Sequence, residues 1–183
     1  MKMKLIHFSD KPETISNRLF THVSNCKVPF NKPQSGGLWA SPYTSNNKTN
    51  PYHPYLGDWE RFCAIELSCP EHCKYYCIFE LDSDRIAIIN SFKDYLKLIC
   101  EYPHTLNDYV GLDFEKISQS YDAIYLTKSG QLECHKLGTT ILNINGLKYK
   151  DPYALFGWDC ESLLIFNLDH IKVDSYCTGH TSP

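Results

Sequence analysis

The segment GWDCESLLIFN, residues 157–167, carries the clearest structural signal in this chain. Two acids one residue apart, Asp159 and Glu161, open a run of five residues, four of them large and apolar. Such a run predicts a buried strand, in which residues i and i+2 project from the same face. We therefore expect Asp159 and Glu161 to lie side by side at the start of a core strand, where a carboxylate is costly without a cationic or hydrogen-bonding partner. Solvated carboxylates at the rim of the strand, with Asp159 serving the preceding turn, are the alternative.

Further strand-like runs alternate with a few helices along the rest of the chain. Strands are predicted over residues 4–9, 38–41, 75–81, 86–90, 121–127 and 170–173, while residues 141–147 are ambiguous. Helices are predicted over residues 12–20, 92–99 and 113–120, with Ser91 capping the second, and a helical turn over residues 58–63 capped by Asp58. Residues 43–57 predict a long surface loop, and residues 128–130 a turn. These elements indicate one α+β domain over residues 1–183 with a mostly antiparallel sheet.

Composition narrows the functional classes. A net charge of -3 and a pI near 6.2 provide no basic surface for general nucleic-acid binding. We expect no membrane segment, because no run of 18 apolar residues occurs. His7, Ser9 and Asp10 interrupt the apolar N-terminal run, so we expect no signal peptide and a cytosolic location.

The nine cysteines are the unusual part of the composition. An odd number without a signal peptide favours reduced thiols over a disulfide framework. The densest group does not match the paired spacing of common zinc sites, so we expect small buried side chains and no metal. A zinc-stabilised interaction domain is the alternative, built on Cys63, Cys69, His72, Cys73 and Cys77.

Three short segments suggest a family when they are taken in order. His7 ends the first predicted strand, Trp39-Ala40-Ser41 forms another, and the pair Asp159-x-Glu161 opens the strand near the C-terminus. This order resembles the mono-ADP-ribosyltransferases, enzymes that use NAD as donor, and in particular their small phage and bacterial members. The chain differs from the usual pattern in having His rather than Arg on the first strand and Asp rather than Glu or Gln upstream of the glutamate.

The resemblance implies an ADP-ribosyltransferase-like fold with a split, mostly antiparallel sheet and a few flanking helices. It implies transfer of ADP-ribose from NAD to a protein side chain, with arginine favoured, by a bacterial effector or toxin that works in the cytosol or is delivered into that of a host cell. Glu161 would stabilise the oxocarbenium-like transition state, and Asp159 would receive or orient the acceptor. The expected NAD-binding residues are His7, Ser9, Trp39, Ser41 and Tyr43, with Ser41 orienting Glu161.

Two other functions fit the same residues. With water as the acceptor, the protein would be an NAD glycohydrolase. It would instead be a non-catalytic module that binds a nucleotide or a partner if Glu161 is structural, His7 an ordinary hydrogen-bonded histidine and Trp39 a core aromatic. No Rossmann or Walker glycine motif is present, so NAD would not bind in either of those ways.

Overall fold

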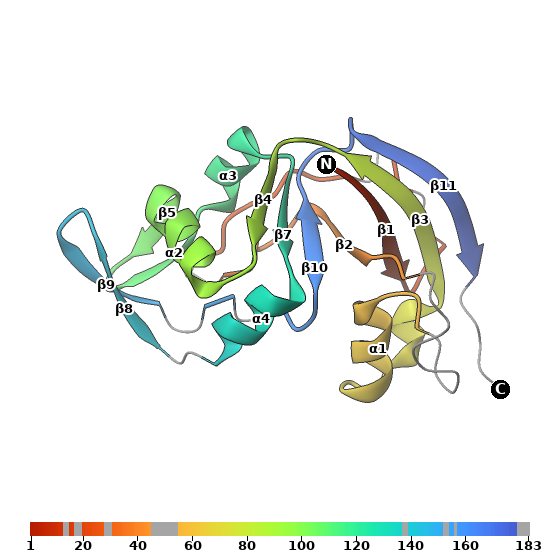
Figure 1. Cartoon of the computed structure of the whole chain (residues 1–183), viewed down its shortest axis with the longest axis horizontal. Helices are drawn as coiled ribbons and strands as arrows, with labels where there is room; N and C mark the ends of the chain where they lie inside the picture. Colours follow the sequence, from red (N-terminus) through yellow and green to blue (C-terminus); the bar gives the residue numbers. More distant parts are fainter. Residues whose placement is uncertain are drawn as a thin grey trace.

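The computed structural model describes residues 1–12, 15–16, 20–27, 31–44, 55–136, 139–151, 154–155 and 157–178. These residues form an α+β fold in which short helices flank two sheets (Figure 1). The strands are β1 (Lys2–Ser9), β2 (Leu38–Pro42), β3 (Tyr75–Asp82), β4 (Ile86–Ile89), β5 (Pro103–Leu106), β6 (Tyr109–Leu112), β7 (Ala123–Leu126), β8 (Thr140–Ile144), β9 (Leu147–Asp151), β10 (Ser162–Ile165) and β11 (Ile171–Thr178). The helices are α1 (Asp58–Ile65), the 3₁₀ helix η1 (Pro70–Cys73), α2 (Phe92–Glu101), α3 (Phe114–Ser120) and α4 (Lys128–His135).

The larger sheet has seven strands in the order β11-β3-β1-β2-β10-β7-β4. Its neighbouring strands are antiparallel except for β4 and β7, which run parallel. The smaller sheet has the order β5-β6-β9-β8, in which β6 and β9 meet in parallel. The predicted α+β class and the predominance of antiparallel pairing are therefore confirmed. Within the described residues, no helix is long and apolar enough to span a bilayer.

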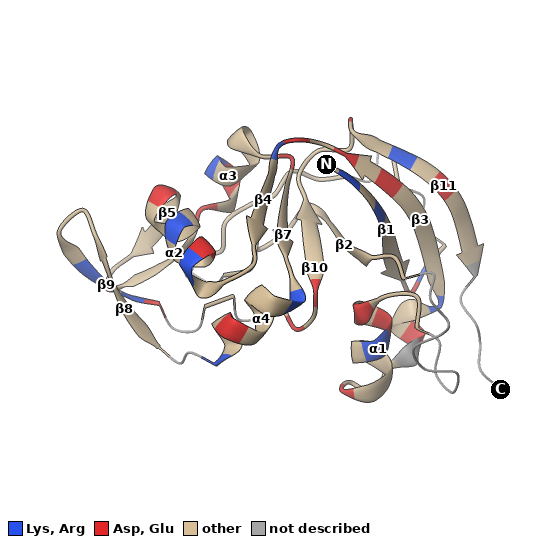
Figure 2. Cartoon of the chain, in the orientation of Figure 1, with Lys and Arg blue, Asp and Glu red and all other residues tan. Residues whose placement is uncertain are grey.

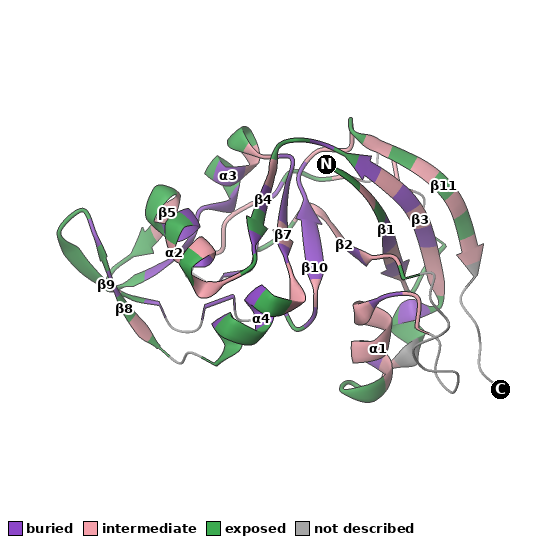
Figure 3. Cartoon of the chain, viewed as in Figure 1, coloured by how far each residue is buried: buried purple, intermediate pink, exposed green. Residues whose placement is uncertain are grey.

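Strand β10 lies near the middle of the larger sheet and is buried along its whole length (Figure 3). Leu164 packs into a core cluster that includes Trp158, whereas Leu163 and Ile165 pack into a second cluster that includes Leu5. Since side chains alternate between the faces of a strand, the two clusters cover opposite faces of β10. This double burial explains why the segment is continuously apolar instead of alternating.

Several predicted elements are confirmed together with their caps. Strands β1, β2, β3, β4, β7 and β11 lie where the sequence predicts strands. The Ser91 hydroxyl accepts the N–H of Asp94 at the start of α2. The Asp113 carboxylate caps α3, whose Phe114 and Ile117 are buried. Each cap satisfies a helix N–H that has no partner within the helix.

Two segments differ from the prediction in their secondary structure. Residues 128–130, predicted to form a turn, begin helix α4, which is capped by the hydroxyl of Thr127. The ambiguous segment forms the hairpin β8–β9, which turns at Asn145 and Gly146, both with positive φ. An Asn-Gly pair favours this kind of two-residue turn because both positions tolerate the left-handed conformation.

Four predictions need correction or restriction. Gly57, and not Asp58, occupies the N-cap of α1, and no side chain caps this helix. Strand β10 begins at Ser162, so the expectation that Asp159 and Glu161 share one face of that strand is wrong. Much of the predicted helix at 12–20 lies outside the described residues, and its described members, 12, 15, 16 and 20, are not helical. Residues 45–54 of the predicted surface loop also lie outside the described residues.

Gly130 allows α4 to pack directly on strand β4. A Cβ atom at this position would lie 2.1 Å from the backbone oxygen of Ile89, closer than any real contact. We predict that Gly130→Ala lowers the free energy of unfolding by roughly 3 kcal/mol, because α4 must move away from the sheet. Urea denaturation monitored by circular dichroism measures the change.

Gly146→Ala is the matched control for this substitution. Gly146 has a φ of +83°, but a Cβ atom added there would meet no other atom within 4 Å, so only backbone strain opposes the change. We expect a loss of about 1 kcal/mol for this variant. Equal losses in the two variants would contradict the close packing of α4 on β4.

Candidate functional site

A cavity of about 300 Å³ lies where β1, β2 and the start of β10 approach helix α1. Figure 1 shows α1 just beyond the ends of β1 and β2, with β10 on the other side of β2 from β1. The cavity is lined by residues 6–8 of β1, 39–41 of β2, Trp59 of α1, residues 157–160, Ser162 and Lys32. Segments far apart in the sequence thus converge on one site.

The cavity forms where the pairing of two strands stops. β1 pairs with β3 along its whole length, but with β2 it pairs only at Leu5↔Pro42 and Ile6↔Ser41. One residue beyond, the His7 ring replaces the backbone ladder, with its Nδ1 2.7 Å from the Trp39 carbonyl oxygen. A carbonyl oxygen can only accept, so Nδ1 carries the proton of this bond. The His7 side chain thereby holds β1 and β2 together at the edge of the cavity.

All three tryptophans of the chain line this cavity. The rings of Trp39 and Trp158 meet edge to face, with centroids 4.7 Å apart and planes at 71°. Trp158 is fully buried, and Trp59 is contributed by helix α1. Rigid aromatic walls of this kind suit a flat ring in the ligand.

A buried polar network fixes the tryptophan wall from behind. The indole N–H of Trp158 donates to the Asn31 carbonyl at 2.5 Å. The Asn31 amide donates to the Asp151 carboxylate at 3.1 Å and accepts the Leu112 N–H, while the Tyr95 hydroxyl donates to Asp151 at 2.9 Å. Asp151 is fully buried, so these hydrogen bonds compensate the loss of hydration of its carboxylate. The network joins the cavity to the smaller sheet and to α2.

The Asp58 carboxylate ties α1 to the chain ahead of β10 and to α4. Its Oδ2 accepts from Lys128 Nζ at 3.0 Å and from the Glu161 backbone N–H at 3.1 Å, and its Oδ1 accepts from Arg61 at 3.0 Å. Figure 2 shows acidic residues at both the start of α1 and the start of β10. Burial on its own would raise the pKa of Asp58, but the bonds from Lys128, Glu161 and Arg61 outweigh it and lower the pKa.

Glu161 is held beside the cavity by Tyr125. The Tyr125 hydroxyl donates to the Glu161 carboxylate at 2.5 Å, and both side chains are half-buried. Burial, followed by the hydrogen bond and charge of Glu161, raises the pKa of Tyr125 well above its usual value. The phenol therefore stays protonated at neutral pH and is the donor in its hydrogen bond to the Glu161 carboxylate.

The cysteines near the site are neutral thiols. Burial, reinforced by the charges of Asp58 and Asp159, raises the pKa of Cys160 to about 12, so this cavity residue is no nucleophilic thiolate. Cys63 and Cys73 pack together in an apolar cluster with Phe8. Nowhere in the described part of the chain do three His, Cys, Asp or Glu side chains gather in a way that could hold a metal ion.

The structure separates the predicted site residues into two groups. His7, Trp39, Ser41 and Asp159 line the cavity. The other three predicted residues, Ser9, Tyr43 and Glu161, are not among the described residues that line it. The Ser9 hydroxyl bonds to the Lys11 carbonyl, Tyr43 packs in an apolar cluster, and Glu161 contacts Tyr125.

The sequence did not reveal the contributions of Lys32, Trp59, Asp58 and Tyr125. Asp58 carried a weak signal as an acid at a helix start, and Tyr125 was predicted only as a strand residue. Lys32 lies within the Pro- and Asn-rich stretch at 28–34, which has no periodic pattern that could place it. No protein-family model matches the chain, and no curated protein or solved structure is significantly similar to it.

The lowered pKa of Asp58 makes its contribution to stability dependent on pH. We predict that Asp58→Asn lowers the free energy of unfolding by about 1–2 kcal/mol at pH 7, where the carboxylate is ionised in both states. A group whose pKa is lowered by folding loses its contribution as the pH falls through the folded value. The difference between wild type and variant should therefore shrink below about pH 4.

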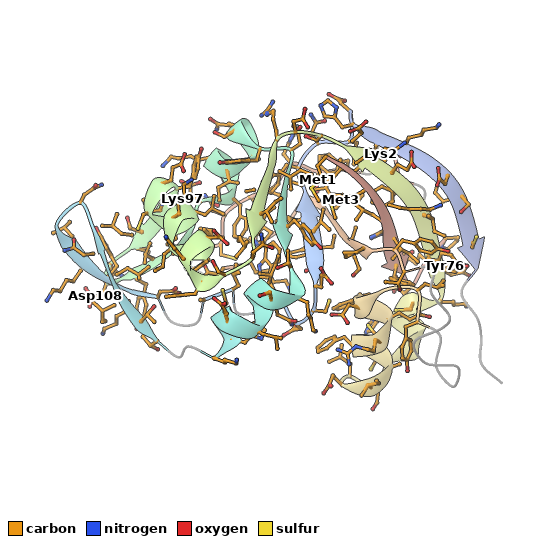
Figure 4. The ribbon with its side chains drawn as sticks, in the orientation of Figure 1. Met1, Lys2, Met3, Tyr76, Lys97 and Asp108 are labelled. Atoms are coloured by element: carbon orange, nitrogen blue, oxygen red, sulfur yellow. The ribbon has the colours of Figure 1, made fainter. Side chains whose placement is uncertain are left out.

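Chemical denaturation of both proteins across this pH range measures the effect. Asp108→Asn is the control, since Asp108 is exposed in the turn of the smaller sheet, at the far end of the molecule from α1 (Figure 4). Asp113 also has a lowered pKa and contributes to acid loss in every variant, so the differences and not the absolute values are decisive. If the difference in unfolding free energy between wild type and Asp58→Asn stayed constant from pH 7 to acid, the stabilising role of the ionised Asp58 carboxylate would be contradicted.

Proposed function

We propose that the protein is a mono-ADP-ribosyltransferase that transfers ADP-ribose from NAD to a protein side chain, with arginine as the favoured acceptor. The observation that carries this proposal is the convergence of His7, Trp39, Ser41 and Asp159 on one cavity. These positions come from three distant segments, and the resemblance assigns them to one site around NAD.

The shape of the site supports a nucleotide donor. A volume of about 300 Å³ is at the lower end for small-molecule sites and suits the nicotinamide and ribose half of NAD. The interrupted pairing of β1 and β2 agrees with the split sheet that the resemblance implies, and we propose an ADP-ribosyltransferase-like fold on this ground. His7 would hold a hydroxyl or a phosphate of the donor, and Trp39 would cover the nicotinamide ring.

The proposed reaction exchanges one bond at the ribose. The bond between C1′ and the nicotinamide nitrogen breaks, and its electron pair leaves with neutral nicotinamide. The acceptor nitrogen then forms a bond to C1′ and releases a proton. Between these events C1′ carries positive charge, which a fixed carboxylate stabilises where water is excluded.

Glu161 is the residue proposed to provide this carboxylate. In the structure, the Glu161 carboxylate accepts a hydrogen bond from the Tyr125 hydroxyl, and a ribose hydroxyl of NAD could donate the same kind of hydrogen bond. Binding of NAD would replace the contact with Tyr125 by a contact with the ribose and bring the Glu161 carboxylate to C1′. The neighbours of Glu161, Cys160 and Ser162, already line the cavity, so we propose that a rotation of the Glu161 side chain brings its carboxylate into it.

Binding of the donor can be detected without a label. Because all three tryptophans line the cavity, we predict that NAD quenches the intrinsic tryptophan fluorescence in a saturable way. Nicotinamide alone should quench more weakly, because it lacks the ribose and the phosphates. Unchanged fluorescence at millimolar NAD would contradict the assignment of the cavity to this donor.

Transfer is tested with NAD radiolabelled in its adenylate phosphate and a whole-cell lysate. We predict label on a discrete protein band, and a loss of about 100-fold or more in Glu161→Gln, which removes the charge that stabilises the transition state. Glu101→Gln, an exposed carboxylate at the end of α2, is the matched control and should label like wild type. Equal labelling by wild type and Glu161→Gln would refute the catalytic role.

The products also separate the alternatives. Free ADP-ribose without labelled protein, again dependent on Glu161, would identify an NAD glycohydrolase. Intact NAD in every lysate, with tight binding retained in Glu161→Gln, would identify a binding module. Asp159→Asn should be tested for both donor binding and acceptor preference, since a carboxylate in the cavity can contact either group.

A further inference from the structure

Two opposite charges lie at the rim of the tryptophan-lined cavity without neutralising each other. Lys32 and Asp159 both line the cavity, and both are exposed at its opening. Within the described ranges, Lys32 and Asp159 do not form a salt bridge with each other, and neither forms one with any other residue. The cavity therefore offers one cationic and one anionic group to whatever enters it.

Asp58, another charged residue beside the site, is neutralised within the protein. Asp58 is paired with Lys128 and Arg61. A charge that is satisfied inside the protein is unavailable to a ligand, whereas Lys32 and Asp159 can contact one directly. The apolar floor provided by Ile6 strengthens the field of both rim charges, since walls of low polarity screen less than water.

Contacts of the neighbouring backbone fix the positions of the two rim residues, Lys32 and Asp159. Asn31 is anchored by its contacts to Trp158 and Asp151, and the Cys26 thiol donates to the Lys32 carbonyl at 3.2 Å. The Lys32 stem passes close to Gly157, where a Cβ atom would lie 3.4 Å from Lys32 Cδ. Gly157 has a φ of +86°, which other residues rarely adopt, and the chain continues directly to Asp159. The same short segment thus borders both charges.

We propose that this pair of charges selects a bipolar nucleotide, with Asp159 facing the cationic pyridinium ring of NAD⁺ and Lys32 facing its pyrophosphate. The inference rests on the proposed function and names what the cavity recognises in the donor. The ribose separates the two charged groups of the nicotinamide mononucleotide half, so both can be met within one cavity. The tryptophan faces add to the preference for a cationic ring.

Three related ligands, which differ in the charged groups that they carry, allow the contributions of Asp159 and Lys32 to be measured separately. NAD⁺ carries both the pyridinium cation and the pyrophosphate, NADH keeps the pyrophosphate but has a neutral nicotinamide ring, and ADP-ribose lacks that ring entirely. The carbocyclic analogue of NAD⁺ replaces NAD⁺ itself, because its nicotinamide bond is not cleaved during the measurement. Isothermal titration calorimetry of each ligand against wild type, Asp159→Asn and Lys32→Gln gives the dissociation constants.

The two variants should give opposite patterns. Asp159→Asn should weaken the carbocyclic NAD⁺ analogue about tenfold and leave NADH and ADP-ribose almost unchanged, because only the first has a cationic ring. Lys32→Gln should weaken all three ligands about tenfold, because all three carry the pyrophosphate. Asp108→Asn and Lys148→Gln, exposed residues of the smaller sheet, are the matched controls and should bind like wild type. Thermal melting of each variant checks that it folds.

The outcomes distinguish failure of this inference from failure of the proposed function. If wild type binds none of the three ligands, the proposed function fails. If wild type binds them but Asp159→Asn weakens all three equally, or Lys32→Gln weakens none, the function stands and the assignment of the two charges is overturned. The proposal is supported if Asp159→Asn loses the preference for the NAD⁺ analogue over NADH while Lys32→Gln keeps it.

Discussion

The short ladder between β1 and β2 is the constraint on which the site depends. Strand β2 belongs to both halves of the larger sheet, because it pairs with β1 on one side and with β10 on the other. A full ladder on both sides would close the sheet and leave no space between the strands. Pairing ends at Ile6↔Ser41, and the His7 side chain then bridges to the Trp39 carbonyl. One side-chain hydrogen bond thus replaces a backbone ladder and leaves room for a cavity.

The opened sheet would be unstable without support from outside it. Asp58 provides that support on one side, since it joins α1, Lys128 of α4 and the backbone of Glu161. Asn31 provides it on the other, through Trp158 and the buried Asp151. Both hubs satisfy their own polar groups, so their burial costs little. Hydrogen-bonded and ion-paired side chains therefore surround a cavity whose own rim charges, Lys32 and Asp159, form no salt bridge within the described residues.

Sequence reasoning located the elements that repeat apolar residues in a simple pattern. Most strands of the larger sheet and helix α2 were predictable because burial leaves a pattern of apolar residues in their sequences, whereas β5 and β6 of the smaller sheet were not predicted. Helix α4 was missed because the packing of Gly130 on Ile89, and not a stripe of large apolar residues, fixes it. The Asn145-Gly146 pair is typical of a hairpin turn, but the residues on either side of it did not clearly indicate strands. The contacts of Asp58 and Tyr125 depend on tertiary neighbours, which no local pattern encodes.

The acid pair shows most clearly what the period of a strand cannot decide. Residues two apart share a face only inside a regular strand, and Asp159 and Glu161 lie ahead of β10 in an irregular segment. One carboxylate consequently borders the cavity, while the other is half-buried and hydrogen-bonded to Tyr125. Two carboxylates in different surroundings can take different roles within one site, because their hydration and hydrogen bonding differ. The bend at Cys160 thus places the two acids in different surroundings, one at the edge of the cavity and one beside it in contact with Tyr125.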